Sequence, residues 1–328
     1  MKQYKIYSLI CVLLLAFTVA CSDDYQKEGP IGKILKNDCL KRSLGPNVVG
    51  LDIEFVYAMA LPRSQGKLLS ATVEATIAGA PETYLEHRSY YTSGSGADVG
   101  VTVGTPCTNS GTKTEVTFSV DTCAASLRYF YRIPAEAQGK EVKFTFTVKA
   151  SNGETVSYKM GPYKIEKMDM KRNLTVSNGD KCYISIADMA VYNAAEVASS
   201  PGKIDLVYLY RSIAGVTFGH AYVSPATDAT YRRDAVIPSG ASNNTRIRKE
   251  YGLRDRHLAN LQYGIYVTDL DLQTIDLSAM PNYALNVYNE GGMWVETSDG
   301  KYRAYIYVNS INNTAGTAVI SMKRLTVK

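Results

Sequence analysis

The chain's only tryptophan lies among acidic residues, in a segment whose side chains could contact or cleave a sugar. Trp294 has Glu290 four residues before it, and Glu296 and Asp299 follow it. Hydrolysis of a glycosidic bond needs two carboxyl groups flanking that bond, one protonated and one ionised. Because tryptophan is usually well buried, we favour a hairpin in which Trp294 packs against the core and the acids are solvated. Trp294 is still kept as a candidate ligand-binding residue, and the three acids as candidates for a less favoured glycan hydrolase.

Basic residues are concentrated between positions 232 and 256. Seven basic residues stand there against three acidic ones, whereas the whole chain has a formal net charge of only +5. Arginine forks bind carboxylate and sulfate groups in a bidentate way, so an anionic glycan is a chemically sensible ligand. The alternative, a loop whose charges are solvated or paired with neighbouring acids, is favoured. The candidate ligand-binding arginines are Arg246, Arg248 and Arg254.

Tyrosines, of which the chain has 25, recur in pairs two residues apart. In a β-strand such a pair shares one face, and aromatic faces can stack on the C–H surfaces of sugars. Packing against neighbouring strands is the commoner role of such rings and is favoured. The pairs are Tyr129 with Tyr131, Tyr208 with Tyr210, and Tyr305 with Tyr307, of which Tyr305 and Tyr307 are candidate ligand-binding residues.

No catalytic, cofactor or metal motif is recognisable in the sequence. The three histidines are scattered, and there is no CxxC pair, P-loop, GxSxG elbow or HExxH helix. Asp269 and Asp271 would share one face of a strand over residues 263–271, where two carboxylates can help to hold Ca²⁺, but the solvent side of an amphipathic strand is favoured. The mild charge does not indicate nucleic acid. We therefore expect a protein that is not an enzyme and has no cofactor or metal.

The first residues predict export and a lipid anchor. Lys2 and Lys5 precede an apolar run over residues 6–20, which is short for a permanent membrane span. The run ends at Cys21 in a pattern that resembles the bacterial lipobox, whose cysteine is acylated after cleavage. Two or three acyl chains give stable attachment. We predict a signal peptide over residues 1–20 and a lipidated tether over 21–32. The acidic Ser22-Asp23-Asp24 favours the outer face of the outer membrane over periplasmic retention.

Four cysteines would remain in the mature, oxidising environment once Cys11 is removed and Cys21 is acylated. Four cysteines allow three disulfide connectivities. The preferred pairing joins Cys107 with Cys123 across a local turn and strand, and Cys39 with Cys182 across the two halves of the chain. A zinc site is the rival interpretation, but no ligand spacing supports it.

Alternating apolar and polar residues predict an all-β protein of two sandwich domains. Short strands with turn signals between them indicate an immunoglobulin-like β-sandwich over residues 33–166. A charged stretch over 167–181 is predicted to be a linker. Residues 182–328 are predicted to form a second β-sandwich with one or two short helices, at 193–198 and 253–261. Its candidate strands lie at 183–187, 204–210, 263–271, 283–288, 302–308 and 318–325.

The lipobox with Ser22-Asp23-Asp24, the β-sandwich first half, and the patterns at residues 190–192 and 204–208 resemble uncharacterised two-domain lipoproteins of Bacteroidota. That family is a domain of unknown function, so the resemblance implies no activity. A looser similarity to glycan-binding lipoproteins of starch-utilisation-type systems concerns fold and location alone. We expect a surface-exposed lipoprotein that binds a glycan or another extracellular ligand, with an outer-membrane transporter as a possible partner. The alternative is an adhesin or fimbrial-type subunit that polymerises by strand exchange.

Overall fold

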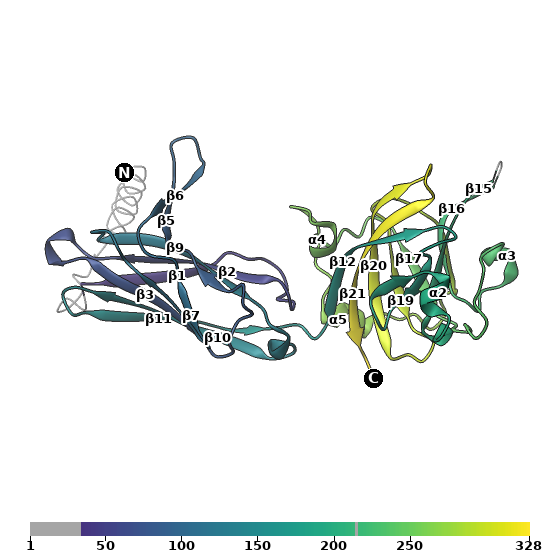
Figure 1. Cartoon of the computed structure of the whole chain (residues 1–328), viewed down its shortest axis with the longest axis horizontal. Coiled ribbons are helices and arrows are strands. Elements are labelled where there is room, and N and C mark those ends of the chain that lie inside the picture. Colours follow the sequence, from purple (N-terminus) through teal and green to yellow (C-terminus); the bar gives the residue numbers. More distant parts are fainter. Residues whose placement is uncertain (1–33, 214–215) are drawn as a thin grey trace, which may run out of the picture.

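The computed structural model describes residues 34–213 and 216–328. The predicted signal peptide, Cys21 and the predicted tether lie outside these residues. The described chain folds into two β-sandwiches with a few short helices, which confirms the predicted all-β class. Figure 1 shows the two sandwiches next to each other along the long axis of the molecule.

The first domain packs a four-stranded sheet on a five-stranded sheet, and a two-stranded hairpin extends from its edge (Figure 1). The four-stranded sheet has the order β1 (Lys36–Lys41), β2 (Asp52–Ala60), β9 (Ala124–Arg132), β4 (Tyr84–Leu85). The five-stranded sheet has the order β11 (Thr155–Lys164), β10 (Glu141–Ala150), β3 (Leu68–Ala75), β8 (Lys113–Thr117), β7 (Thr108–Ser110). The hairpin consists of β5 (Arg88–Thr92) and β6 (Asp98–Thr102).

Strict alternation places one face of each central strand in the core of the first domain. In β2 and β9 every second residue is buried, so their apolar and aromatic side chains face the opposite sheet. Phe55, Phe144 and Phe146 meet there, with ring centroids 4.9 Å apart for Phe55 and Phe144 and 5.2 Å for Phe55 and Phe146. These tilted and edge-on contacts are favourable geometries for aromatic rings.

The second domain packs two five-stranded sheets. One has the order β12 (Asp169–Ser177), β21 (Thr317–Thr326), β20 (Tyr302–Asn312), β19 (Gly292–Glu296), β17 (Arg246–Glu250). The other has the order β14 (Ala190–Tyr192), β13 (Tyr183–Ser185), β15 (Leu206–Ile213), β16 (Val216–Val223), β18 (Tyr283–Val287). Short helices lie between strands: α2 (Ala194–Val197), α3 (Ala229–Arg232), α4 (Arg256–Ala259) and α5 (Asp269–Thr274).

Two sequence-based assignments in this region are wrong. The predicted linker over residues 167–181 contains β12, an edge strand that pairs with β21 from Asp169 onward, because its charged side chains lie on the exposed face of a strand. The predicted strand over residues 263–271 ends in α5. Thr268 caps this helix, accepting a hydrogen bond from the backbone N–H of Asp271, so the two aspartates do not share a strand face.

A separate apolar cluster covers the outer face of β19 and β20. It includes Met168, Leu258, Val267, Leu272 and Leu325 of the second domain together with Val48 of the first. The strands β19 and β20 therefore have apolar side chains on both faces, one toward the sandwich core and one toward this cluster. The presence of Val48 in it means that the two domains share buried contacts.

Candidate ligand-binding surface

The three aromatic residues predicted to contact a ligand are buried. Trp294 is 4% exposed, Tyr305 is fully buried and Tyr307 is 2% exposed. The Trp294 Nε1 donates to the Glu250 carboxylate at 3.3 Å, and the Tyr305 hydroxyl donates to the Leu253 carbonyl at 2.6 Å. Their candidate role as ligand-stacking rings is wrong, because β19 and β20 are covered on both faces, and the favoured interpretation, packing inside the fold, is confirmed.

The three candidate arginines are paired with acids from the same sheet and from a nearby turn. Arg246 lies 3.7 Å from Glu296, and Arg248 lies 3.0 Å from Glu250. Arg254 forms an ion pair with Glu290. Glu250 lies within the basic stretch, whereas Glu290 and Glu296 come from outside it, so each candidate arginine already has an acidic partner and the favoured alternative of paired charges is confirmed for all three. Arg254 and Glu290 both remain well exposed, at 51% and 38% of their side chains.

The segments that carry Arg254 and Glu290 also carry exposed large side chains. Tyr263 is 79% exposed, Tyr251 60%, Tyr288 52% and Ile265 51%. Large apolar groups exposed together with a few polar groups mark binding surfaces. We call these six residues the tyrosine surface: Tyr251, Arg254, Tyr263, Ile265, Tyr288 and Glu290.

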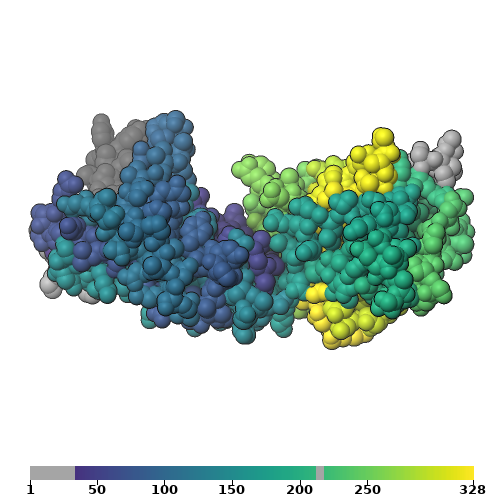
Figure 2. Space-filling model, viewed as in Figure 1, coloured from purple at the N-terminus to yellow at the C-terminus, as the bar shows by residue number. Residues whose placement is uncertain are grey.

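Three segments bring the tyrosine surface together. Tyr251 directly follows β17, whose last residue, Glu250, pairs with Gly292 at the start of β19. Tyr288 and Glu290 belong to the turn that leads into β19, where Gly291 N–H donates to the Tyr288 carbonyl at 3.0 Å. The segment 263–265 lies beside Arg254. In Figure 2 light green atoms of this region project from the second domain on the side nearer the first domain.

Main-chain bonds fix the loop that carries Tyr263 and Ile265. Ile265 N–H donates to the Arg254 carbonyl at 3.0 Å, and Arg256 N–H donates to the Ile265 carbonyl at 2.8 Å. A side chain at Gly264 would begin 2.4 Å from the Arg254 carbonyl oxygen, so only glycine fits between the two segments. The loop therefore approaches Arg254 through its backbone and leaves its side chains free.

The end of β18 and the turn that follows it each contain an unusual backbone conformation. Asn286 and Glu290 have φ angles of 54° and 63°, in the left-handed region that favours glycine. Such conformations carry a cost of about 1–3 kcal/mol and gather at binding and active sites. Glu290, which has one of these conformations, forms the ion pair with Arg254.

A buried ion pair fixes the loop that carries Tyr263 and Ile265 of the tyrosine surface. Lys323 and Asp255 are both fully buried, and Lys323 Nζ lies 2.7 Å from Asp255 Oδ2. Asp255 also accepts from the N–H groups of Leu258 at 2.9 Å and Val267 at 2.6 Å, and Lys323 donates to the Val267 carbonyl at 2.8 Å. These bonds hold both ends of the loop from residue 255 to 267. Burial lowers the pKa of the Lys323 ammonium, while Asp255 opposes that shift.

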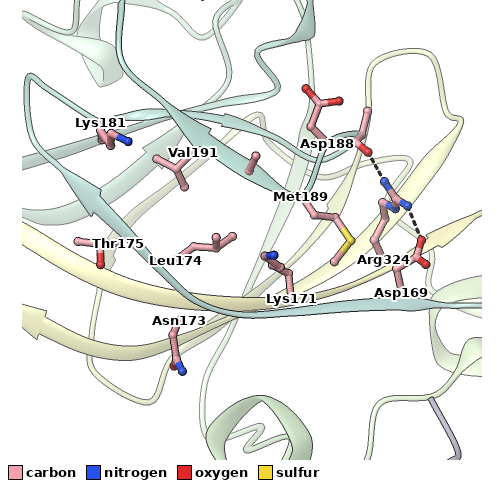
Figure 3. A pocket seen from close by; sticks show the side chains of 12 residues that line it. Asp169, Lys171, Asn173, Leu174, Thr175, Lys181, Asp188, Met189, Val191 and Arg324 are labelled. Carbon is pink, nitrogen blue, oxygen red and sulfur yellow. Dashed lines mark hydrogen bonds and ion pairs between the residues drawn. The ribbon is translucent and has the colours of Figure 1, made fainter. Parts of the chain in front are cut away.

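A groove elsewhere on the second domain, shown in Figure 3, is a second candidate site. It has a volume of about 720 Å³, and its walls come from β12 and from residues 187–191 at β14. Arg324 pairs with Asp169 and also donates to the Ala187 carbonyl. Lys171 has no ion pair among the described residues. Lys181, which also lines the groove, lies 3.8 Å from Glu196, so Lys171 is the one lysine of the groove without an ion pair among the described residues, and the groove ranks second as a ligand site.

A smaller cavity of about 140 Å³ is lined by the buried Asp205 and by Asp299. Burial raises the pKa of the Asp205 carboxyl to about 7, and Asp299 adds to the shift. Asp205 accepts from the Ile186 N–H at 2.7 Å, which fixes the turn before β14. Asp299 accepts from the Thr297 hydroxyl at 2.7 Å and the Lys301 N–H at 2.9 Å. Both carboxyls therefore have structural partners.

Asp205 predicts a specific dependence of stability on pH. Its pKa is raised on folding, so its contribution to the free energy of unfolding is full below about pH 4 and is lost as the pH rises toward 7. The loss amounts to at most about 1.4 kcal/mol per pH unit. Urea unfolding of wild type and Asp205→Asn between pH 4 and 8 tests this dependence. The difference between their free energies of unfolding should change with pH up to about 7 and level off above it. Parallel curves over the whole range would contradict the assignment.

The three acids of the less favoured hydrolase have structural partners too. Glu290 pairs with Arg254, and Glu296 pairs with Arg303 at 2.8 Å as well as with Arg246. No group of three or more potential ligands for a metal ion occurs within residues 34–213 and 216–328. Over the same residues, none of the helices has the length and apolar character needed to cross a bilayer.

The predicted disulfides are wrong, since Cys39, Cys107, Cys123 and Cys182 are all free thiols. Cys39 packs into the core of the first domain and Cys182 into the core of the second, so they cannot meet. Cys107 directly precedes β7 of the five-stranded sheet, whereas Cys123 directly precedes β9 of the four-stranded sheet. The chain between them crosses from one sheet to the other instead of closing a local hairpin. Burial raises the pKa of the Cys39 thiol to about 12.

Comparisons with known proteins place both halves of the chain in families without an assigned activity. Residues 32–165 match the family model "Domain of unknown function (DUF4466)", and residues 166–327 match "Domain of unknown function (DUF8576)". None of the curated proteins matches the chain.

One solved structure is similar over nearly the whole described chain. It is the crystal structure of a DUF4466 family protein from Parabacteroides merdae, with 48% sequence identity, a TM-score of 0.85, and coverage of 89% of this chain and 99% of that chain. The major pilin subunit of Bacillus cereus is 9% identical, with a TM-score of 0.28 and coverage of 89% and 67%. The Actinomyces fimbrial adhesin FimA is also 9% identical, with a TM-score of 0.29 and coverage of 90% and 96%. The two low scores carry no functional argument, whereas the first match shows that this chain belongs to the DUF4466 family.

Proposed function

We propose that the protein is an exported, lipid-anchored binding protein that holds a polysaccharide on the tyrosine surface of its second domain, without catalysis. The observation that carries the proposal is the exposure of three tyrosines on the neighbouring segments that bear the exposed Arg254–Glu290 pair. Rings of this kind stack on the C–H faces of sugars, while exposed charged groups hydrogen-bond to hydroxyls. Trp294 and Tyr305, the aromatic residues that the sequence suggested for stacking on a sugar, are buried and have no exposed ring face.

The chemistry favours a neutral polysaccharide over an anionic one. Arg254 is already paired with Glu290, so an anionic ligand would have to displace a carboxylate. Lys249 lies above the Tyr251 ring at 4.9 Å and donates to the Leu285 carbonyl at 2.7 Å. A hydroxyl pair of a neutral sugar can instead accept from Arg254 and donate to Glu290 without breaking their contact.

The fold supports a spacer role for the first domain. In β1, Lys36 pairs with Ala60 and Lys41 with Phe55, and the chain then reaches Gly45, which contacts Tyr266 of the second domain. The strand therefore runs from the far end of the first domain toward the second (Figure 1). With a lipid on Cys21, as the lipobox predicts, the first domain would stand between the membrane and the tyrosine surface. An outer-membrane transporter is the partner that this proposal implies for uptake of the bound glycan.

Affinity electrophoresis of residues 22–328 tests the proposal, since both apolar cores lie within them. Gels contain neutral or anionic polysaccharides, and retardation is measured. We expect retention by at least one neutral polysaccharide and a weakening of about 10- to 100-fold in Tyr251→Ala/Tyr263→Ala, since each stacking ring contributes about 0.5–1.5 kcal/mol beyond its buried area.

Two control variants separate the surfaces. Tyr91→Ala removes a tyrosine of the first domain with a similar exposure, 55%, and should leave retention unchanged. Lys171→Ala alters the groove of Figure 3 and should also leave it unchanged. Loss of retention in Lys171→Ala but not in the double tyrosine variant would move the site to the groove. Failure of wild type to bind any neutral or anionic polysaccharide would overturn the proposed function.

A further inference from the structure

A loop of the first domain, residues 42–51, contacts the segment that carries the tyrosine surface. Gly45 in this loop has a φ of +80°, and a methyl group added there would lie 2.5 Å from the Tyr266 ring. Val48, which is fully buried, belongs to the same apolar cluster as Leu258 and Val267. The loop therefore packs on the segment from 256 to 267 at two points.

Tyr266 links this contact to the tyrosine surface. It directly follows Ile265, whose backbone N–H and C=O bind Arg254 and Arg256. The Arg256 guanidinium lies 5.1 Å from the Tyr266 ring centroid, and the His257 ring lies 4.7 Å from it. Movement of the Tyr266 ring would thus shift Ile265 and, through the backbone bonds, Arg254.

The segment between the domains is held by both of them. Glu166 N–H donates to the Asn47 carbonyl of the first domain at 2.8 Å. The next two N–H groups, of Lys167 and Met168, donate to the Asp269 carboxylate of the second domain at 2.6 and 2.9 Å. Every N–H from 166 to 168 therefore has a partner, so the loop 42–51 meets Tyr266 at a fixed position.

We propose that the first domain sets the ligand affinity of the second, because its loop 42–51 holds Tyr266 and thereby positions Tyr263, Ile265 and Arg254. Gly45 and Val48 are positioning residues in this scheme and do not touch the ligand. The inference rests on the proposed function, but the mobility of residues 253–266 tests it without any ligand.

Two glycines of the same loop provide a matched pair of variants. Gly45 and Gly50 have nearly equal φ angles, +80° and +81°, so alanine introduces similar backbone strain at either position. They differ in their surroundings, since alanine at 45 meets the Tyr266 ring whereas alanine at 50 has no atom within 4 Å. Any difference between Gly45→Ala and Gly50→Ala therefore reports the contact with Tyr266.

Hydrogen exchange measured by mass spectrometry, together with affinity electrophoresis, tests the inference on residues 22–328. We expect Gly45→Ala to increase deuterium uptake in peptides covering 253–266 at least about threefold and to weaken retention at least about fivefold, with Gly50→Ala close to wild type in both. Equal uptake in the two variants would overturn the inference, whether or not a polysaccharide binds. Increased uptake with unchanged retention would overturn the positioning role and leave the proposed function standing. Absence of wild-type retention would overturn the proposed function, and the uptake alone would then decide whether the domains are coupled.

Discussion

Replacement of Lys323 by alanine is expected to lower the free energy of unfolding of the second domain by about 3–5 kcal/mol. Lys323 and Asp255 are both fully buried, and their 2.7 Å contact neutralises each charge in a place that water does not reach. Removal of one partner leaves the other as an uncompensated buried charge, which is strongly destabilising. The Val267 carbonyl would also lose the hydrogen bond that Lys323 Nζ donates to it. Urea unfolding followed by the fluorescence of Trp294 measures the loss.

Lys171→Ala is the control for this prediction. Lys171 is an exposed lysine on β12, next to β21, which carries Lys323, and it has no ion pair among the described residues. Its replacement should change the free energy of unfolding by no more than about 0.5 kcal/mol. If Lys323→Ala cost as little as this control, the buried pair would not be the support of the loop 255–267.

Replacement of Phe146 by alanine is expected to destabilise the first domain by about 3–5 kcal/mol. Phe146 is fully buried, and its ring centroid lies 5.1 Å from that of Tyr57 and 5.2 Å from that of Phe55. The neighbouring rings belong to two facing sheets that cannot collapse around the gap, so a cavity should remain. Calorimetry measures the change as a lower melting temperature for the transition of the first domain.

Phe130→Ala provides the comparison, because Phe130 lies on the outer face of β9. Its ring stacks on Tyr84 at 4.7 Å, and both rings are only partly buried. Phe130 buries less apolar area than Phe146, and its removal leaves no internal cavity. We therefore expect Phe130→Ala to lower the free energy of unfolding by about 1 kcal/mol. Comparable losses for the two phenylalanines would contradict the assignment of the core to the inner face.

Alternation in the sequence predicts the fold well because each sheet of the first domain has one buried face. Residues 51–57 and 142–148 follow the two-residue period, and the corresponding strands β2 and β10 bury every second residue. The same rule fails at Trp294, since β19 is buried on both faces and its residues from Gly292 to Val295 are all buried. Alternation cannot tell which side of a strand faces solvent when both sides are covered.

The errors in the linker and disulfide predictions have a common physical cause. The charged residues of β12 and the spacing of the cysteines are local features, whereas strand pairing with β21 and the separation of the two cores depend on distant residues. The tyrosine surface was missed for the same reason. Tyr251, Tyr263 and Tyr288 follow no period, since Tyr251 and Tyr288 directly follow strands and Tyr263 lies between α4 and α5. Their one shared sequence signal is a tyrosine directly followed by glycine or asparagine.

The most direct test of the account is the footprint of a retained polysaccharide, mapped by hydrogen exchange on residues 22–328. The account predicts slower exchange in peptides covering 249–256, 260–266 and 286–291, with the first domain and the groove unaffected beyond residues 42–51. Protection confined to residues 169–191, or to the hairpin of β5 and β6, would contradict the placement of the ligand on the tyrosine surface.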